Sequence, residues 1–189
     1  MGIALADKAS EYGARVELVL GPVSLRPKRT TIKIINVTTA ASMAEACISR
    51  FPHCDIAIMA AAVADFSPAI VEERKVKRTD NELNIRLIPT QDIAETLGNA
   101  KKTSQILAGF ALETHDEINN AVRKLHRKNM DLIVLNSLQD KGAGFEHDTN
   151  KITLIDNNNN IDNFELKPKE KVAEDILKKI VSLINLKAR

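Results

Sequence analysis

Apolar positions along this chain alternate between the spacing of a helix and the spacing of a strand. Helical spacing predicts helices over residues 1–13, 39–51 and 115–129 and a last helix that opens at Pro168. Short apolar runs predict strands over residues 15–20, 32–37, 55–61, 106–110 and 131–135. This alternation is typical of βαβ units, so we expect an α/β fold with a mostly parallel sheet between layers of helices.

Two segments depart from this alternation. Residues 82–87 alternate polar and apolar side chains, which predicts an antiparallel ribbon that packs on another subunit or covers a site. Residues 151–155 and 161–166 flank a polar run and predict a β-hairpin before the final helix. The sequence shows no internal repeat and no interdomain linker, so we expect a single domain over residues 1–189.

Composition narrows the class of protein. The chain has 189 residues, 44% hydrophobic and 28% charged, as in a soluble globular domain, and its net charge of +2 gives no indication of a nucleic acid partner. No apolar run is long enough for a membrane span and no signal peptide is recognisable, so we expect no membrane partner and a cytoplasmic location. The two cysteines and four histidines lack the spacing of metal ligands, so no residue is assigned to a metal.

The first candidate binding site follows the predicted strand at residues 55–61. The apolar run 56–59 is expected to be buried, and the alanines at 60–62 would let a ligand approach the backbone, with Asp65 at the lip. The basic run 75–78 then lies in a solvated loop that can fold over a polyanion. An ordinary strand end with a charged surface loop would have the same pattern, so both interpretations stay open.

Further candidates lie at the ends of later elements. Thr90 is expected to cap a helix that starts at residues 91–94, and Phe110 is expected at the end of a strand. Lys124 and Lys128 are spaced to share one face of the helix at 115–129. The glycine-containing loop at residues 142–145 permits tight turns but does not match GxGxxG.

Six motifs occur in order along the chain: Met1-Gly2-Ile3-Ala4-Leu5-Ala6, Gly21-Pro22-Val23-Ser24-Leu25, Ala61-Ala62-Val63-Ala64-Asp65-Phe66, Lys75-Val76-Lys77-Arg78, Gly109-Phe110-Ala111-Leu112-Glu113-Thr114 and residues 124–129. Together they resemble the phosphopantothenate–cysteine ligase family, also called phosphopantothenoylcysteine synthetase, over essentially the whole chain. That family forms the synthetase half of the bacterial bifunctional coenzyme A biosynthesis protein. The resemblance implies a Rossmann-like three-layer fold, usually dimeric. It also implies an enzyme that uses CTP and Mg²⁺ to activate the carboxylate of 4'-phosphopantothenate as an acyl cytidylate, from which the amine of cysteine displaces CMP.

The resemblance also implies roles for residues of this chain. Lys75 would be the catalytic residue, contacting the triphosphate from a mobile loop that closes on the substrate. The implied CTP site consists of Met59, Ala60, Ala61, Ala62, Asp65, Lys75, Gln91, Asp92, Ile93, Ala94, Phe110, Lys124 and Lys128. Each role has a plain structural alternative: solvent-facing lysines, a core phenylalanine, an aspartate that forms a turn and ordinary chemistry at a helix start.

Segments that the resemblance implies before Met1 are absent from this sequence. They are a strand, a Gly-Pro-Thr turn, an Asn-x-Ser-Ser-Gly-Lys loop for the substrate phosphate and, further upstream, a flavin-containing decarboxylase domain. We therefore expect a shortened enzyme whose sheet lacks its first strand and leaves neighbouring backbone groups unpaired. Two alternatives stay open: a noncatalytic nucleotide-binding protein that pairs with an upstream polypeptide or decarboxylase domain, and a dehydrogenase, although the GxGxxG turn is missing.

Overall fold

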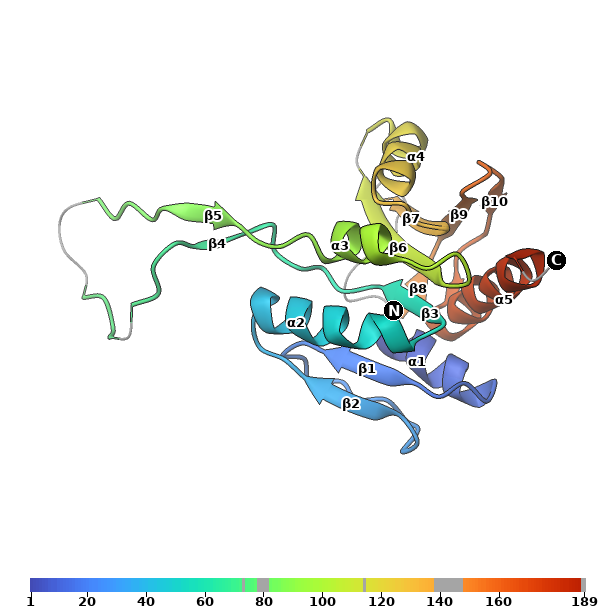
Figure 1. Ribbon diagram of the computed structural model, residues 1–189, viewed down its shortest axis with the longest axis horizontal. Helices are drawn as coiled ribbons and strands as arrows, with labels where there is room; N and C mark the ends of the chain where they lie inside the picture. The colour runs from blue at the N-terminus through green and yellow to red at the C-terminus, as the bar shows by residue number, and fades with distance from the viewer. Residues whose placement is uncertain (73, 78–81, 114, 138–147, 188–189) are drawn as a thin grey trace.

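The computed structural model describes residues 1–72, 74–77, 82–113, 115–137 and 148–187 (Figure 1). The helices are α1 (Gly2–Glu11), α2 (Ala40–Arg50), α3 (Ile93–Ala100), α4 (Glu117–Arg127) and α5 (Lys169–Lys187), with the 3-10 turn η1 (Phe51–His53) after α2. The strands are β1 (Glu17–Leu20), β2 (Lys33–Asn36), β3 (Ile56–Met59), β4 (Phe66–Pro68), β5 (Leu87–Pro89), β6 (Ile106–Glu113), β7 (Leu132–Ser137), β8 (Thr149–Asn150), β9 (Ile152–Asp156), β10 (Ile161–Asn163) and β11 (Lys167–Pro168). The predicted α/β class is thus confirmed. The glycine-containing loop at 142–145 lies outside the described residues, as do Arg78 and Thr114.

The central sheet is mixed: the expected parallel arrangement holds for β3, β6 and β7, and antiparallel pairs adjoin it. Its five strands run in the order β10-β9-β7-β6-β3. The pairs β3–β6 and β6–β7 are parallel, whereas β9 pairs antiparallel with both β7 and β10. The antiparallel part is the predicted hairpin, whose strands β9 and β10 form and join the sheet edge beyond β7.

The strands β1 and β2 form a separate parallel pair. No ladder joins β1 to β3 within the described part of the chain. Residues 56–59 were expected to be buried, but they are only half-buried, because β3 is an edge strand that pairs with β6 alone. The expectation that the sheet lacks its first strand stays a prediction.

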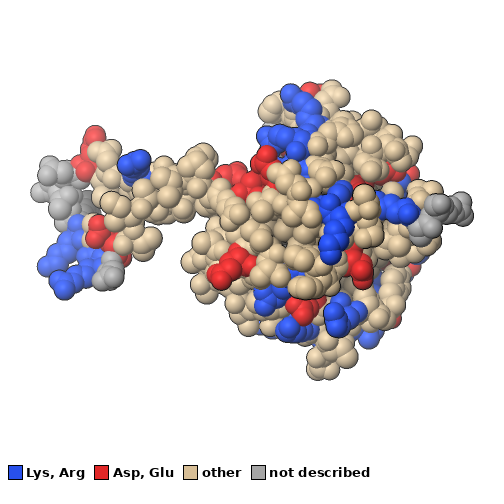
Figure 2. Space-filling model, viewed as in Figure 1, with Lys and Arg blue, Asp and Glu red and all other residues tan. Residues whose placement is uncertain are grey.

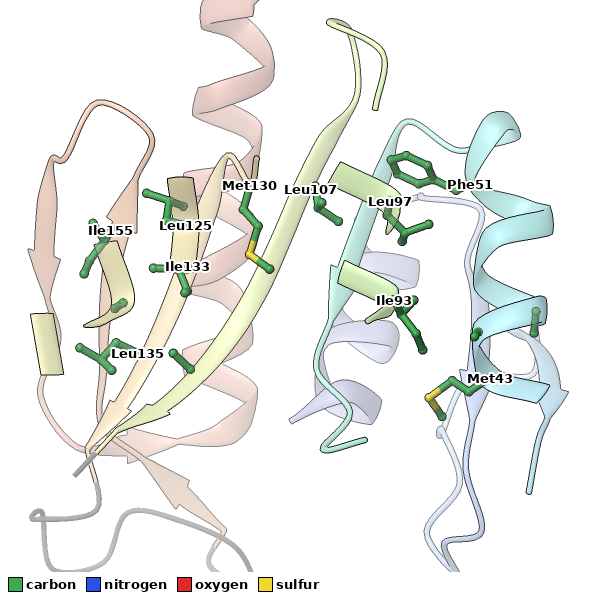
Figure 3. Packing of buried hydrophobic residues seen from close by; sticks show 14 of the residues in the cluster. Met43, Phe51, Ile93, Leu97, Leu107, Leu125, Met130, Ile133, Leu135 and Ile155 are labelled. Carbon is green, nitrogen blue, oxygen red and sulfur yellow. The ribbon is translucent and has the colours of Figure 1, made fainter. Parts of the chain in front are cut away.

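Helices cover both faces of the central sheet, as expected. Alternate side chains of β6 and β7 point to opposite faces, so Leu107 and Ile133 pack with α2, α3 and α4 while Ile106 and Val134 pack with α1 and α5. Figure 3 shows the first of these two apolar clusters, with Leu97 of α3 and Leu125 of α4 over the sheet. Among the described residues, no helix has the length and apolar content that a membrane crossing requires.

A two-stranded extension leaves this body between β3 and α3. Strands β4 and β5 pair antiparallel, and Figure 1 shows the described residues that continue from both strands reaching far out from the body. We call residues 66–89 the arm, residues next to β4 and β5 its root and the segment 74–77 its outer end. The antiparallel type of the ribbon predicted at 82–87 is confirmed, but its bounds are wrong, since the paired strands are Phe66–Pro68 and Leu87–Pro89.

Candidate functional site

Thr90, which lies between the arm and α3, holds the root of the arm through one side-chain and one backbone hydrogen bond. The Thr90 hydroxyl donates to the carbonyl oxygen of Ala64 over 2.6 Å, and the Thr90 N–H donates to the carbonyl oxygen of Asp65 over 2.9 Å. Thr90 is therefore not the helix cap that its sequence position predicts. That role belongs to Asp92, whose carboxylate accepts from the N–H of Glu95 over 3.0 Å, so α3 begins at Ile93 rather than at residue 91.

Lys128 is tied to this helix start. Its Nζ lies 2.6 Å from Oδ2 of Asp92, and its side chain is only 11% exposed. Burial by itself would raise the pKa of Asp92, but hydrogen bonds from Lys128 and the Glu95 N–H outweigh that effect and hold this pKa below its usual value. The ion pair fixes the end of α4 against the N-terminus of α3.

Lys124 lies one helical turn before Lys128 on the same face of α4, as the spacing predicts. Its Nζ donates to the carbonyl oxygen of Phe110 over 3.4 Å. Burial lowers the pKa of Lys124, and the positive charge of Lys128 lowers it further, while the carboxylates of Glu113, Asp92 and Asp65 act in the opposite direction. Lys124 is thus a half-buried amine in a cluster that also holds a second amine and three carboxylates.

Phe110 lies inside β6 and not at its end, because the strand continues to Glu113. Its half-buried ring packs against the apolar cluster of α1 and α5, on the face of the sheet opposite α4, together with Ala60. Only its carbonyl group meets Lys124. This placement favours the alternative that the Phe110 side chain belongs to the core.

The alanines after β3 lie at the carboxyl edge of the sheet, close to this cluster. Strand β3 ends at Met59, which pairs in register with Gly109 of β6. Ala60 is half-buried, whereas Ala61, Ala62 and Asp65 are exposed. Because ligands of α/β sheets bind at the carboxyl ends of parallel strands, this edge is a suitable place for a ligand.

The remaining predicted residues at the start of α3 differ in how accessible their side chains are to a ligand. Gln91 is exposed and its amide reaches the Thr96 hydroxyl at 3.5 Å. The Ile93 side chain is buried in the core, and Ala94 is half-buried against it. Ile93 and Ala94 can therefore offer a ligand only their backbone groups.

Lys75 is the one predicted residue that the structure places away from the others. It is exposed and belongs to the outer end of the arm (Figure 1). The structure thus brings together Asp65, Asp92, Lys124 and Lys128 at the body, which we call the lysine cluster, and leaves Lys75 apart from it.

Sequence reasoning missed Glu113 in this site and the close packing of Gly109 in the core beside it. Glu113 acts electrostatically on Lys124, and it stands within a motif quoted above, directly before Thr114. Gly109 faces Met130 so closely that an added Cβ would lie 2.7 Å from the methionine sulfur. Its position beside Phe110 in the same motif was the available signal, although the partner at Met130 comes from a distant segment.

A metal site made from protein groups alone is not found, because no group of three or more His, Cys, Asp or Glu residues in the described ranges could hold an ion. Mg²⁺ that is bound together with a nucleotide needs fewer protein ligands, since one or two carboxylates usually hold it together with phosphate oxygens and water. Asp65 and Glu113 are two carboxylates of this kind that act electrostatically on Lys124.

The comparisons with known proteins agree on a family. The family described as DNA/pantothenate metabolism flavoprotein C-terminal domain matches residues 1–184. A protein from an unknown prokaryotic organism, named Cysteine/Cysteine sulfinic acid decarboxylase, is 60% identical over 185 residues, which are 98% of this chain and 52% of that protein. The Coenzyme A biosynthesis bifunctional protein CoaBC of Bacillus subtilis (strain 168) is 43% identical over 183 residues, 97% of this chain and 45% of that protein.

A solved structure supports the same assignment. The crystal structure of the C-terminal domain of the Coenzyme A biosynthesis bifunctional protein CoaBC superposes with a TM-score of 0.81 at 36% identity and covers 97% of this chain and 83% of that one. This chain spans about half the length of the two curated relatives, so their names describe longer proteins. The chain belongs to the DNA/pantothenate metabolism flavoprotein C-terminal domain family, which contains the phosphopantothenate–cysteine ligase domain of CoaBC.

Proposed function

We propose that this chain acts in coenzyme A biosynthesis as a CTP-dependent ligase of 4'-phosphopantothenate and cysteine. The observation that carries the proposal is the lysine cluster, in which two amines of one helix meet the carboxyl edge of the sheet in a chain of this family. The reaction would couple the carboxylate to CMP with release of pyrophosphate. The amine of cysteine would then displace CMP and form phosphopantothenoylcysteine.

The chemistry explains the need for amines. A carboxylate is a poor acyl donor because its oxide is a poor leaving group, and the link to a nucleotide phosphate supplies a better one. The loss of pyrophosphate requires positive charge around the phosphates more than a proton donor or acceptor. Lys124 would provide that charge from a partly desolvated position, where its electrostatic effect is stronger than in water.

Lys128 would contribute in a different way. Its charge is already paired with Asp92, and this ion pair fixes the distance between α3 and α4. We assign Lys128 to positioning of the nucleotide against the start of α3, where the free N–H groups of the helix favour negative charge. Mg²⁺ bound with CTP would screen the phosphates further, with Asp65 and Glu113 as its protein ligands.

A second candidate function is nucleotide binding without turnover, in partnership with an upstream polypeptide. One observation favours it: no ladder joins β1 to β3 in the described part of the chain. The two functions share the lysine cluster and differ in whether the chain completes the reaction by itself.

The test compares binding and turnover in the same samples. CTP and ATP binding would be measured by calorimetry with Mg²⁺, and pyrophosphate release would be followed after addition of 4'-phosphopantothenate and cysteine. Lys124→Gln should weaken CTP binding at least tenfold, because it removes one amine from a desolvated phosphate site. Lys178→Gln, an exposed lysine of α5, is the matched control and should change neither quantity.

Each outcome assigns a function. Binding with product formation supports the ligase, and binding without product supports the noncatalytic alternative. Unchanged CTP affinity in Lys124→Gln would overturn the assignment of the lysine cluster to the nucleotide.

A further inference from the structure

Helix α4 ends at a left-handed asparagine. Asn129 has a φ of 47°, and its N–H donates to the carbonyl oxygen of His126 over 3.1 Å. The N–H of Met130 donates to the carbonyl oxygen of Leu125 over 2.9 Å. These two bonds form the Schellman motif, in which a left-handed residue ends a helix, and asparagine adopts that conformation more readily than most residues. The motif therefore fixes the backbone at Lys128, the residue before Asn129.

The last turn of α3 lies directly against this helix end. A Cβ added at Gly98 would lie 1.9 Å from the carbonyl oxygen of Lys128 and 2.9 Å from its carbonyl carbon, so only glycine permits this approach. The side-chain amide of Asn129 donates to the carbonyl oxygen of Gly98 over 2.8 Å. Nζ of Lys101 donates to the carbonyl oxygen of Asn129 over 2.7 Å. The end of α3 is thus joined to the end of α4 by close packing and two hydrogen bonds.

Lys128 consequently contacts α3 at both ends of that helix. Its backbone carbonyl lies beside Gly98 in the last turn, and its ammonium group lies 2.6 Å from Oδ2 of Asp92, the N-cap. Asp92 and Gly98 are six positions apart, which corresponds to about 9 Å along a helix axis. The distance at which the backbone of Lys128 meets Gly98 therefore determines whether its ammonium group reaches Asp92.

The distribution of charge makes the placement of single amines important. Figure 2 shows the Lys and Arg side chains of the body spread over several places and interspersed with acidic side chains. In such a mixed field, attraction of a polyanion depends on the few amines that stand at the site rather than on the whole surface. A small displacement of Lys128 would then change the site, because electrostatic contacts depend on distance.

We propose that Gly98 and Asn129 are positioning residues that hold the ammonium group of Lys128 at Asp92 and thereby set the geometry of the lysine cluster. Glycine inside a helix is less favourable than alanine, so the presence of Gly98 in α3 is explained by the close approach that alanine would prevent. Neither residue has a side chain that meets the nucleotide in this proposal; both act through Lys128. The effect on CTP rests on the proposed function, whereas the positioning of Lys128 does not.

The positioning is tested first in the protein without nucleotide. The NMR signal of the Lys128 ammonium group, assigned by its loss in Lys128→Met, should show slow proton exchange with water, because the group is buried and paired with Asp92. Gly98→Ala should accelerate this exchange about tenfold or more, since α3 must move away from Lys128. Asn99→Ala, at an exposed position of the same turn, is the matched control and should not change it. Fast exchange in the unmodified chain, or unchanged exchange in Gly98→Ala, would overturn the proposal.

Substitution of Asn129 provides a second test that adds no steric conflict at α3. Asn129→Gly keeps the left-handed conformation and removes the hydrogen bond to Gly98, whereas Asn129→Ala also strains the backbone. Both should accelerate the exchange of the Lys128 ammonium protons, and Asn129→Ala should do so more. Circular dichroism verifies that each variant is folded. If Gly98→Ala does not fold, exchange in Asn129→Gly as slow as in the unmodified chain contradicts the positioning role.

A double-mutant cycle tests whether the effect on CTP passes through Lys128. Calorimetry should find that Gly98→Ala weakens CTP binding about tenfold, because a charged contact is misplaced. In the Lys128→Met background the same substitution should have no effect; Asn129→Gly replaces Gly98→Ala in the cycle if the latter does not fold. Equal losses in both backgrounds would indicate a merely structural role, since independent effects add.

The two readouts separate this proposal from the proposed function. Absence of CTP binding by the unmodified chain, together with accelerated ammonium exchange in Gly98→Ala, refutes the nucleotide assignment and supports the positioning of Lys128. CTP binding together with unchanged exchange in both Gly98→Ala and Asn129→Gly refutes the positioning and leaves the proposed function in place.

Discussion

Lys124 and Lys128 are chemically identical side chains one turn apart, and their surroundings make them different. Lys128 pairs with Asp92 at 2.6 Å, whereas Lys124 meets a carbonyl oxygen and has a pKa lowered first by burial and then by Lys128. A polyanion beside Lys124 would favour its charged form and reverse that shift. The residue that gains most from a bound phosphate is therefore Lys124.

This difference predicts proton uptake when CTP binds. Between the lowered pKa of free Lys124 and its usual value of 10.5, the free protein is partly deprotonated at this amine and the complex is not. Calorimetry in buffers with different ionisation enthalpies should show uptake below pH 10.5, and the uptake should disappear as the pH falls below the lowered pKa of Lys124. Lys124→Gln should abolish it; equal uptake in Lys124→Gln would assign the proton to another group.

At the scale of elements, a buried carboxylate holds α5 to the sheet. Asp131 is 2% exposed and precedes β7. Its two oxygens accept from Lys101 at 2.8 Å and from Lys187, in the last turn of α5, at 2.7 Å, while the N–H of Leu107 donates to it over 2.8 Å. One side chain thus connects α5, the loop after α3 and the start of β6.

Removal of this carboxylate should destabilise the fold strongly. Asp131→Ala leaves the ammonium group of Lys101, whose side chain is 8% exposed, without its anion, and we expect a loss of about 3 kcal/mol or more in the free energy of unfolding. Urea unfolding monitored by circular dichroism measures it. Glu174→Gln, which removes an exposed carboxylate paired with Lys171 and Lys178 on α5, is the control and should have little effect. Similar midpoints for the two variants would show that Asp131 is not a structural anchor.

At the scale of the whole molecule, the strands differ in how many neighbouring strands and helices pack against them. The centre of the five-stranded sheet is covered by helices on both faces, and Leu107 and Ile133 are fully buried. The β1–β2 pair joins no other strand within the described residues, and its own residues are mostly half-buried or exposed. Local opening should therefore begin in this pair.

Hydrogen exchange of the native protein should show that the β1–β2 pair opens more readily than the central sheet. We expect amides of β1 and β2 to exchange at least tenfold faster than those in the β6–β7 ladder, because fewer neighbouring strands and less apolar contact oppose their opening. Peptide-resolved mass spectrometry would measure the rates. The amides of α4, which packs on the same sheet centre, should be protected like β6 and β7. Equal protection of β1 and β6 would contradict this account.

Local sequence determined the type and order of most elements and the spacing of the site lysines. Thr39 illustrates why: with Ser42 it forms a capping box, so the start of α2 depends on residues three positions apart. Lys124 and Lys128 share a helix face because helical geometry alone sets that relation. Gly13, two residues after the end of α1, has a positive φ of 85°, a conformation that glycine adopts without a side-chain clash.

Tertiary structure decided the features that depend on partners distant in sequence. Thr90 has a cap-forming side chain, but its hydroxyl bonds to Ala64, twenty-six positions earlier, and the cap passes to Asp92. The direction of β9 also depends on a distant partner, because β9 pairs antiparallel with β7 through hydrogen bonds that no local pattern encodes. The distance of Lys75 from the lysine cluster also arose only in three dimensions, because the arm extends away from the body instead of folding over it. Neighbouring residues determine local geometry such as helix starts and helix faces. Strand pairing and the direction of strands and of the arm depend on contacts that exist only after the chain has folded.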